Sequence, residues 1–138
     1  MIKEIVKDTE FLTQKSEQVS VEEAQEIITD LLDTANHHID NCCGLAAPQI
    51  GLHKRVIVVR NGNTFFPMIN PVIIKKDGRK FVNHEGCLSL EGTRSVDRYS
   101  SVIVGYLDKS GKRIVKTFNG LLAIIVQHET DHLNGILI

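Results

Sequence analysis

The feature that most constrains this 138-residue chain is the segment HETDH, residues 128–132. Residues four positions apart project from the same face of an α-helix, so His128 and His132 can bind one ion together. Glu129 directly follows the first histidine, and from there its carboxylate can act as a general base without being a ligand. The apolar segments LLAIIV and ILI on either side indicate a buried helix, where ionisable groups are costly unless paired or metal-bound. The segment therefore predicts a hydrolytic metal site rather than a solvated helix face.

The length of the chain fits one domain, residues 1–138, that can bury a hydrophobic core. Lysine and arginine together number 16 against 17 acidic residues, so the charge gives no indication of a nucleic-acid or membrane surface. No apolar run approaches the roughly 18 residues that would cross a bilayer. Of the three cysteines two are adjacent, Cys42 and Cys43, which makes a disulfide framework improbable. We therefore expect a protein of the reducing cytoplasm.

Hydrophobic spacing predicts a helix near each end of the chain. Ser20 and Glu23 form the pattern of a capping box, and apolar residues at helical spacing follow them as far as Ile39. This helix is expected to end near residues 41–44. Asn119 is the expected N-cap of a second helix, residues 120–133, which contains HETDH. The metal-binding pair is thus predicted to lie on the C-terminal helix.

Between the two helices the sequence alternates short apolar runs with turn residues. Five strands are predicted, at residues 55–60, 68–75, 80–90, 100–108 and 113–118. The segments KDG (76–78) and DKSG (108–111) have the composition of turns between them. We expect an α+β fold in which antiparallel strands pack around the C-terminal metal-binding helix.

Two histidines do not complete a metal site, and the residues after His132 offer no third ligand. The upstream candidates are His37, His38, Cys42, Cys43, His53, His84, Glu85 and Cys87. Among them Cys87 follows a glycine in the strand-like segment HEGCLSL, and a thiolate with two imidazoles leaves one position for water. A lone cysteine is more often a small buried hydrophobic residue. Both interpretations of Cys87 remain open at this point.

A third segment, CCGLAAPQIG at residues 42–51, combines small residues with an amide. Gly44, Ala46 and Ala47 would let the backbone pass close to a ligand or another strand, and Gln49 offers a hydrogen-bond donor. Taken alone, this segment also fits any tight loop.

Taken in order, the three segments resemble the motifs of the peptide deformylase family. The family pattern is G-x-G-x-A-A-x-Q, E-G-C-x-S and H-E-x-x-H, and here the segments read CCGLAAPQ, EGCLS and HETDH. The similarity extends through nearly the whole chain, including the spacing between the motifs. It implies the peptide deformylase fold and a metal-dependent hydrolase of N-terminal processing in protein biosynthesis. The implied substrate is the N-terminal formylmethionine of new polypeptides, met in the cytoplasm where they leave the ribosome.

The resemblance also implies a role for individual residues of this sequence. The implied metal ligands are Cys87, His128 and His132. Glu129 would be the acid/base, while Gln49 and the backbone N–H of Leu88 would stabilise the oxyanion. Gly44 would lie along the substrate backbone. The residues that would line a pocket for the methionine side chain are Cys43, Leu121, Ile124 and Ile125.

The donor set limits the choice of metal without deciding it. A thiolate with two imidazoles suits Zn²⁺ or Fe²⁺. The resemblance implies ferrous iron, with zinc, nickel or cobalt as substitutes. Asp131 projects away from the ligand pair, and we expect Arg98 to be its partner.

The chain departs from the family pattern at several places. Cys42 replaces the first glycine of the first motif, residues 91–92 are Glu-Gly where many members have a proline, and no C-terminal extension follows Ile138. Two other functions are kept as alternatives. One is a small zinc peptidase that shares H-E-x-x-H, and the other is a non-catalytic relic that binds metal or partners. Intact Glu129 and Gln49 argue against the relic.

Overall fold

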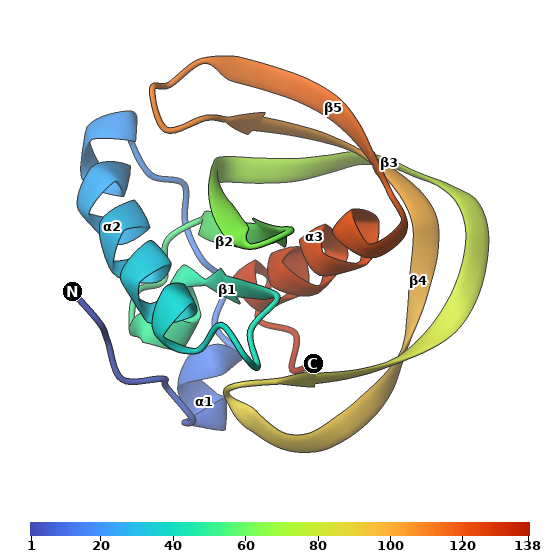
Figure 1. Ribbon diagram of the computed structural model, residues 1–138, viewed down its shortest axis with the longest axis horizontal. Coiled ribbons are helices and arrows are strands. Elements are labelled where there is room, and N and C mark those ends of the chain that lie inside the picture. The colour runs from blue at the N-terminus through green and yellow to red at the C-terminus, as the bar shows by residue number, and fades with distance from the viewer.

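Five antiparallel strands form one sheet in the order β1-β2-β3-β4-β5, and the C-terminal helix lies inside its curve (Figure 1). The computed structural model describes residues 1–138. Its elements are α1 (Thr9–Leu12), α2 (Val21–His37), β1 (Gly44–Ala46), the 3₁₀ helix η1 (Ala47–Ile50), β2 (Val56–Asn61), β3 (Thr64–Cys87), β4 (Leu90–Leu107), β5 (Arg113–Asn119) and α3 (Gly120–Leu133). The α+β fold with antiparallel strands around the C-terminal helix is thus confirmed.

The sheet separates two hydrophobic clusters, and the alternation of side chains along β2 explains why. Val56 and Val58 pack in the cluster that contains the buried face of α2, whereas Ile57 and Val59 pack in the cluster that contains α3. Successive strand residues point to opposite faces of a sheet. Because β2 is buried on both faces, its sequence is a continuous apolar run rather than an alternating one.

The N-terminal helix α2 begins as predicted but ends earlier. The Ser20 side chain accepts the Glu23 N–H at 3.1 Å, while the Glu23 carboxylate lies 3.5 Å from Lys54 Nζ instead of closing a capping box. The helix ends at His37 rather than at residues 41–44. Arg60 Nη1 donates to the Ile39 carbonyl at 2.7 Å, so a side chain from β2 binds this segment in a non-helical turn.

The predicted strands 68–75 and 80–90 were wrong in their boundaries, because the chain turns at a different place. KDG is not a turn: Gly78, with φ 73°, lies in an irregularity of the β3–β4 register between Asp77 and Lys80. The neighbouring Arg79 N–H is bound by Ser100 Oγ on the partner strand at 2.7 Å. A bulge of this kind absorbs an extra residue without ending the pairing. The chain reverses instead at residues 88–89, within the predicted strand 80–90.

The predicted strand 100–108 was wrong in its start, because β4 begins at Leu90 and pairs with β3 from that residue onward. The remaining boundaries follow the sequence more closely. The turn at 108–111 is confirmed, with Asp108 Oδ1 accepting the Lys112 N–H at 2.9 Å. The bounds of α3 are confirmed, although the Asn119 side chain makes no capping hydrogen bond. Helix α1, strand β1 and η1 were not predicted, because three- and four-residue elements are too short to show a period.

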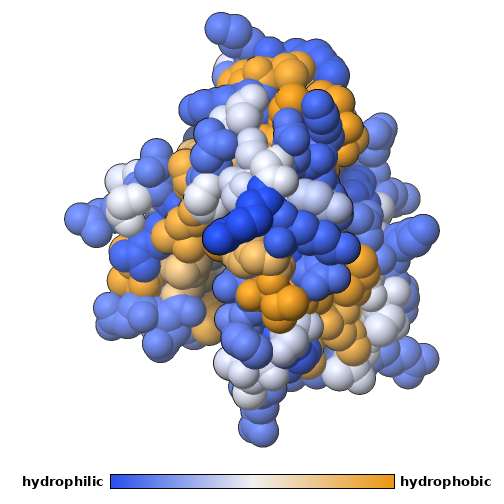
Figure 2. All heavy atoms as spheres, turned by 90° about the vertical axis from the view of Figure 1, so that its right-hand side faces the viewer, coloured by the Kyte–Doolittle hydropathy of each residue, from blue (hydrophilic) through white to orange (hydrophobic).

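The long β3–β4 hairpin presents a mixed surface to solvent. Figure 2 views the molecule from the right-hand side of Figure 1, and hydrophilic side chains lie between hydrophobic ones over much of this face. Val72, Ile74 and Val82 of β3 are among the exposed hydrophobic residues. None of the helices combines the length and the apolar composition needed to cross a bilayer.

Candidate metal and active site

Helix α3 carries three ionisable residues into the interior, where the end of β3 meets them. His128, Glu129 and His132 are each less than a tenth exposed, although they follow an apolar stretch of the same helix. Cys87 is the last residue of β3, immediately before the chain reverses into β4. The ligand atoms of Cys87, His128 and His132 all lie within 4.8 Å of one another. The structure therefore brings together the three residues whose side chains suit a metal.

The orientation of the two imidazoles fits a shared ion. Nδ1 of His128 lies 2.7 Å from Glu85 Oε1, so this nitrogen carries the hydrogen and donates it to the carboxylate. Its other nitrogen, Nε2, is then free to present a lone pair, and it faces Nε2 of His132 at 3.1 Å. Two ring nitrogens and a thiol converge on one place, which is the donor set of a catalytic metal site with one further position open.

A chain of ion pairs connects the strand that carries Cys87 to the helix that carries the histidines. Arg98, in β4, donates to both oxygens of Glu85 at 2.7 and 2.9 Å and to Asp131 of α3 at 2.7 Å. The expected pairing of Asp131 with Arg98 is thus confirmed. Burial disfavours the Glu85 anion, but hydrogen bonds from His128, Arg98 and Asn83 outweigh it and hold the pKa of Glu85 at about 2. From the sequence, Glu85 was considered only as a candidate metal ligand. In the structure Glu85 instead orients the ligand His128.

We expect Arg98→Met to weaken metal binding about 10- to 100-fold, the usual effect of removing a partner behind the ligands. The change leaves the buried Glu85 and the half-buried Asp131 without their cation, so the carboxylate that orients His128 is itself less firmly held. Competition with a chelator measures the affinity. Lys80→Met is the matched control, because Lys80 makes an exposed ion pair 3.6 Å from Asp97 on the same two strands. Equal metal affinity in both variants would show that the ion pairs do not orient the site.

Glu129 lacks a partner for one of its oxygens. The residue is 4% exposed, and Oε1 is buried with no hydrogen bond. Burial raises the pKa of Glu129 to about 7. A Cβ atom at position 44 would lie 2.9 Å from Glu129 Oε2, so only glycine fits beside this carboxylate. A buried polar atom without a partner in the protein is expected to meet one in a ligand.

The side-chain amide of Gln49 is held by two neighbours. Its Oε1 accepts the Ala46 N–H at 3.0 Å, and its Nε2 donates to Ser89 Oγ at 3.2 Å. These bonds fix the orientation of the amide and leave a second Nε2 hydrogen for the pocket that Gln49 lines. The role of Ser89 was missed from the sequence, although the residue ends the EGCLS segment.

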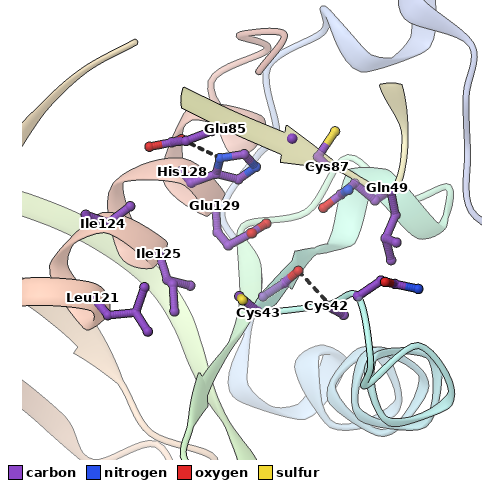
Figure 3. A pocket seen from close by; sticks show the side chains of 14 residues that line it. Cys42, Cys43, Gln49, Glu85, Cys87, Leu121, Ile124, Ile125, His128 and Glu129 are labelled. Atoms are coloured by element: carbon purple, nitrogen blue, oxygen red, sulfur yellow. Dashed lines mark hydrogen bonds and ion pairs between the residues drawn. The ribbon is translucent and has the colours of Figure 1, made fainter. Parts of the chain in front are cut away.

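These groups meet in one cavity of about 180 Å³, drawn from close by in Figure 3. The predicted site residues that line it are Cys43, Gly44, Gln49, Cys87, Leu88, Leu121, Ile124, Ile125, His128 and Glu129. His132 is 2% exposed and is not among the lining residues. The structure thus places in one pocket residues that are more than 80 positions apart in the sequence.

The four histidines that were the other imidazole candidates lie away from the site. His53 stacks on Phe11 at a centroid distance of 3.9 Å, and His84 Nδ1 lies 3.0 Å from Ser95 Oγ. His37 and His38 contact each other at the end of α2. None of these four histidines belongs to the group formed by Cys87 and the α3 pair.

Comparison with known proteins places this geometry in a family. The model of the family described as polypeptide deformylase matches residues 2–138. The chain belongs to the peptide deformylase family. A peptide deformylase of Clostridium beijerinckii is 47% identical over 138 residues, which is 100% of both chains. The actinonin-bound class I type b peptide deformylase of Acinetobacter baumannii has a TM-score of 0.89 and 33% identity, covering 99% of this chain and 95% of that one.

As a peptide deformylase, the chain removes the formyl group from the N-terminal formylmethionine of nascent polypeptides. The deformylase family is metal-dependent, in agreement with the group of thiol and imidazoles. A second solved deformylase, that of Synechococcus elongatus in complex with actinonin, is 36% identical, with a TM-score of 0.88 and coverage of 99% of this chain and 75% of that one. The alternatives of a zinc peptidase and a relic are not favoured.

Cys42, the departure from the deformylase motif, is accommodated in the core. Its side chain is 2% exposed and belongs to the hydrophobic cluster shared with α2. Its thiol donates to the Gly44 carbonyl at 3.2 Å. Burial, together with the charge of Glu129, raises the pKa of Cys42 to about 12, so the group is an uncharged thiol. The substitution therefore adds no charge to the site.

Proposed function

We propose that Cys87, His128 and His132 hold one ferrous ion, for which zinc, nickel or cobalt can substitute. The proposal is supported by the convergence of their ligand atoms within 4.8 Å and by the hydrogen bond that frees His128 Nε2. When bound, such an ion lowers the pKa of water and polarises a carbonyl. The Glu85 carboxylate would orient the His128 imidazole as a ligand.

Glu129 is the acid/base in this proposal, and its buried oxygen without a partner is the observation that carries it. The carboxylate takes a proton from the attacking water and returns it to the departing amine. A pKa raised by burial to about 7 suits both steps, because a group that titrates near neutrality can accept and donate a proton. Gly44 leaves the carboxylate room beside the substrate.

Donors for the developing oxyanion come from residues that line the cavity. Gln49 presents its remaining amide hydrogen, and Leu88 presents its backbone N–H at the point where β3 turns into β4. Donors held in place before the reaction stabilise charge in the transition state without reorganisation. Ser89 positions the first of them, since it binds the other Nε2 hydrogen.

The methionine side chain would enter the apolar part of the cavity. The walls there are Cys43, Leu121, Ile124 and Ile125, and Gly44 lies along the substrate backbone. Leu121 is 66% exposed, which places it at the mouth. The Met-Ala-Ser-bound structure of the Acinetobacter baumannii enzyme, with a TM-score of 0.88, supports a peptide with N-terminal methionine as the ligand. We infer that this chain meets its substrate in the cytoplasm, at the ribosome exit.

The assignment is tested with formyl-Met-Ala-Ser and metal-loaded protein. We expect equal amounts of formate and free amine, and no cleavage of an unformylated peptide with the same residues. Cleavage at an internal peptide bond without formate release would instead indicate a peptidase. A protein with full metal content that releases no amine would be the relic.

The proposed ferrous ion predicts that the activity of the enzyme is sensitive to oxygen. The iron-loaded enzyme is expected to lose activity in air, while nickel- and cobalt-loaded samples keep theirs, because a thiolate-bound ferrous ion is readily oxidised. Parallel assays with and without oxygen measure the loss. Equal stability of all metal forms in air would argue against iron as the native ion.

A further inference from the structure

The three cysteines differ sharply in their surroundings. Cys42 is buried, Cys87 belongs to the metal group, and Cys43 is exposed. Cys43 also lines the cavity, and Figure 3 shows its sulfur on the side of the pocket where Ile125 and Leu121 lie. The wall of the apolar pocket therefore contains a nucleophile that the deformylation reaction does not use.

The position of this thiol is fixed by the sheet. The Cys43 carbonyl accepts the Arg60 N–H at 2.8 Å, and the Arg60 guanidinium binds the Ile39 and Cys42 carbonyls at 2.7 and 3.4 Å. Arg60 of β2 thus binds three carbonyls of the segment before β1. Cys43 is held at the rim of the cavity rather than on a free segment.

A second observation shows that this cavity is built to receive a ligand. Glu129, 4% exposed, lines the same cavity, and its Oε1 has no partner. The carboxylate touches the position directly after Cys43, since a Cβ atom on Gly44 would lie 2.9 Å from it. Cys43 and Glu129 therefore line the same cavity, and Gly44 between them is in contact with the carboxylate.

We propose that Cys43 is a covalent modification site at which low-molecular-weight disulfides close the substrate pocket. The proposal rests on the proposed assignment of this cavity to the methionine side chain. Cys43 gives its proton to solvent, and its thiolate attacks one sulfur of the disulfide. The new bond joins Sγ of Cys43 to that sulfur, while the old S–S bond breaks and the other half leaves as a thiolate. A second thiol reverses the exchange.

The surroundings make the exchange selective for Cys43. The Cys42 thiol is buried, donates a hydrogen bond to Gly44 and has a pKa near 12, so it supplies almost no thiolate. Cys87 is committed to the metal in the loaded enzyme. An adduct on Cys43 that extended into this cavity of about 180 Å³ would take up space assigned here to the substrate side chain.

The first test counts and locates adducts on the metal-loaded protein. Bis(2-hydroxyethyl) disulfide is the probe, and intact mass followed by peptide mapping is the readout. We expect one adduct per chain, on Cys43, that a reducing agent removes and that Met-Ala-Ser slows. An unmodified Cys43, an adduct on Cys42 or Cys87 in its place, or labelling that is indifferent to Met-Ala-Ser would overturn the proposal.

The second test measures deformylation. Activity is expected to fall in proportion to the labelled fraction and to return on reduction. For the Cys43→Ala variant, the activity after treatment is divided by the activity before treatment, and this ratio should stay at one. Full activity in fully labelled enzyme would overturn the proposal and leave the proposed function intact. Absence of deformylation before any treatment would contradict the proposed function, whereas the adduct position and its protection would still report on Cys43.

Discussion

Replacing Glu129 with glutamine is expected to lower the rate of deformylation by about 10²- to 10⁴-fold, the usual contribution of a positioned acid/base. Glutamine keeps the shape of the side chain in a buried site that also contacts Gly44, so the fold should persist. Metal binding should persist as well, since the ligand atoms belong to other residues. The amide cannot take the proton from water or return it to the amine, which is why the rate falls.

The comparison must be made at matched metal content, because a lost ion would imitate a lost base. Glu26→Gln is the control, since Glu26 is an exposed carboxylate on α2. Deformylation by the Glu129 variant at the rate of the parent enzyme would mean that another group is the base.

Replacing Cys87 with alanine is expected to remove most of the bound metal. The site would keep two imidazoles and lose its only anionic ligand atom. The drop in affinity should exceed the roughly 10- to 100-fold expected for a partner behind the ligands, because a bond to the ion itself is lost. Metal analysis after equilibration with a chelator gives the result.

Cys43→Ala is the matched control for metal content, because Cys43 lies in the same pocket but outside the metal group. It should bind metal as the parent chain does. Full metal occupancy in the Cys87→Ala variant would contradict the assignment of Cys87 as a ligand.

Several features of the fold could be predicted because they depend on neighbours in the sequence. The bounds of α3 follow from the hydrophobic periodicity. The cap at Ser20 is a hydrogen bond to a residue three positions on, and the turn at 108–111 is held by its own Asp108. The KDG segment has the same local signals as a true turn. It became a bulge because Ser100, on the partner strand, binds the Arg79 N–H, and no local pattern reports that contact.

The sequence by itself determined that His128 and His132 share a helix face with Glu129 between them, since the helical period places residues four apart together. It left eight candidates for the third ligand. Only the tertiary structure brought the end of β3 against α3, so that the Cys87 thiol lies within 4.8 Å of the imidazole nitrogens. The same packing turned Glu85 into the partner of His128 and placed Arg98 between Glu85 and Asp131. These contacts join residues 13 to 43 positions apart, and such distances are set by strand pairing and burial rather than by local conformation.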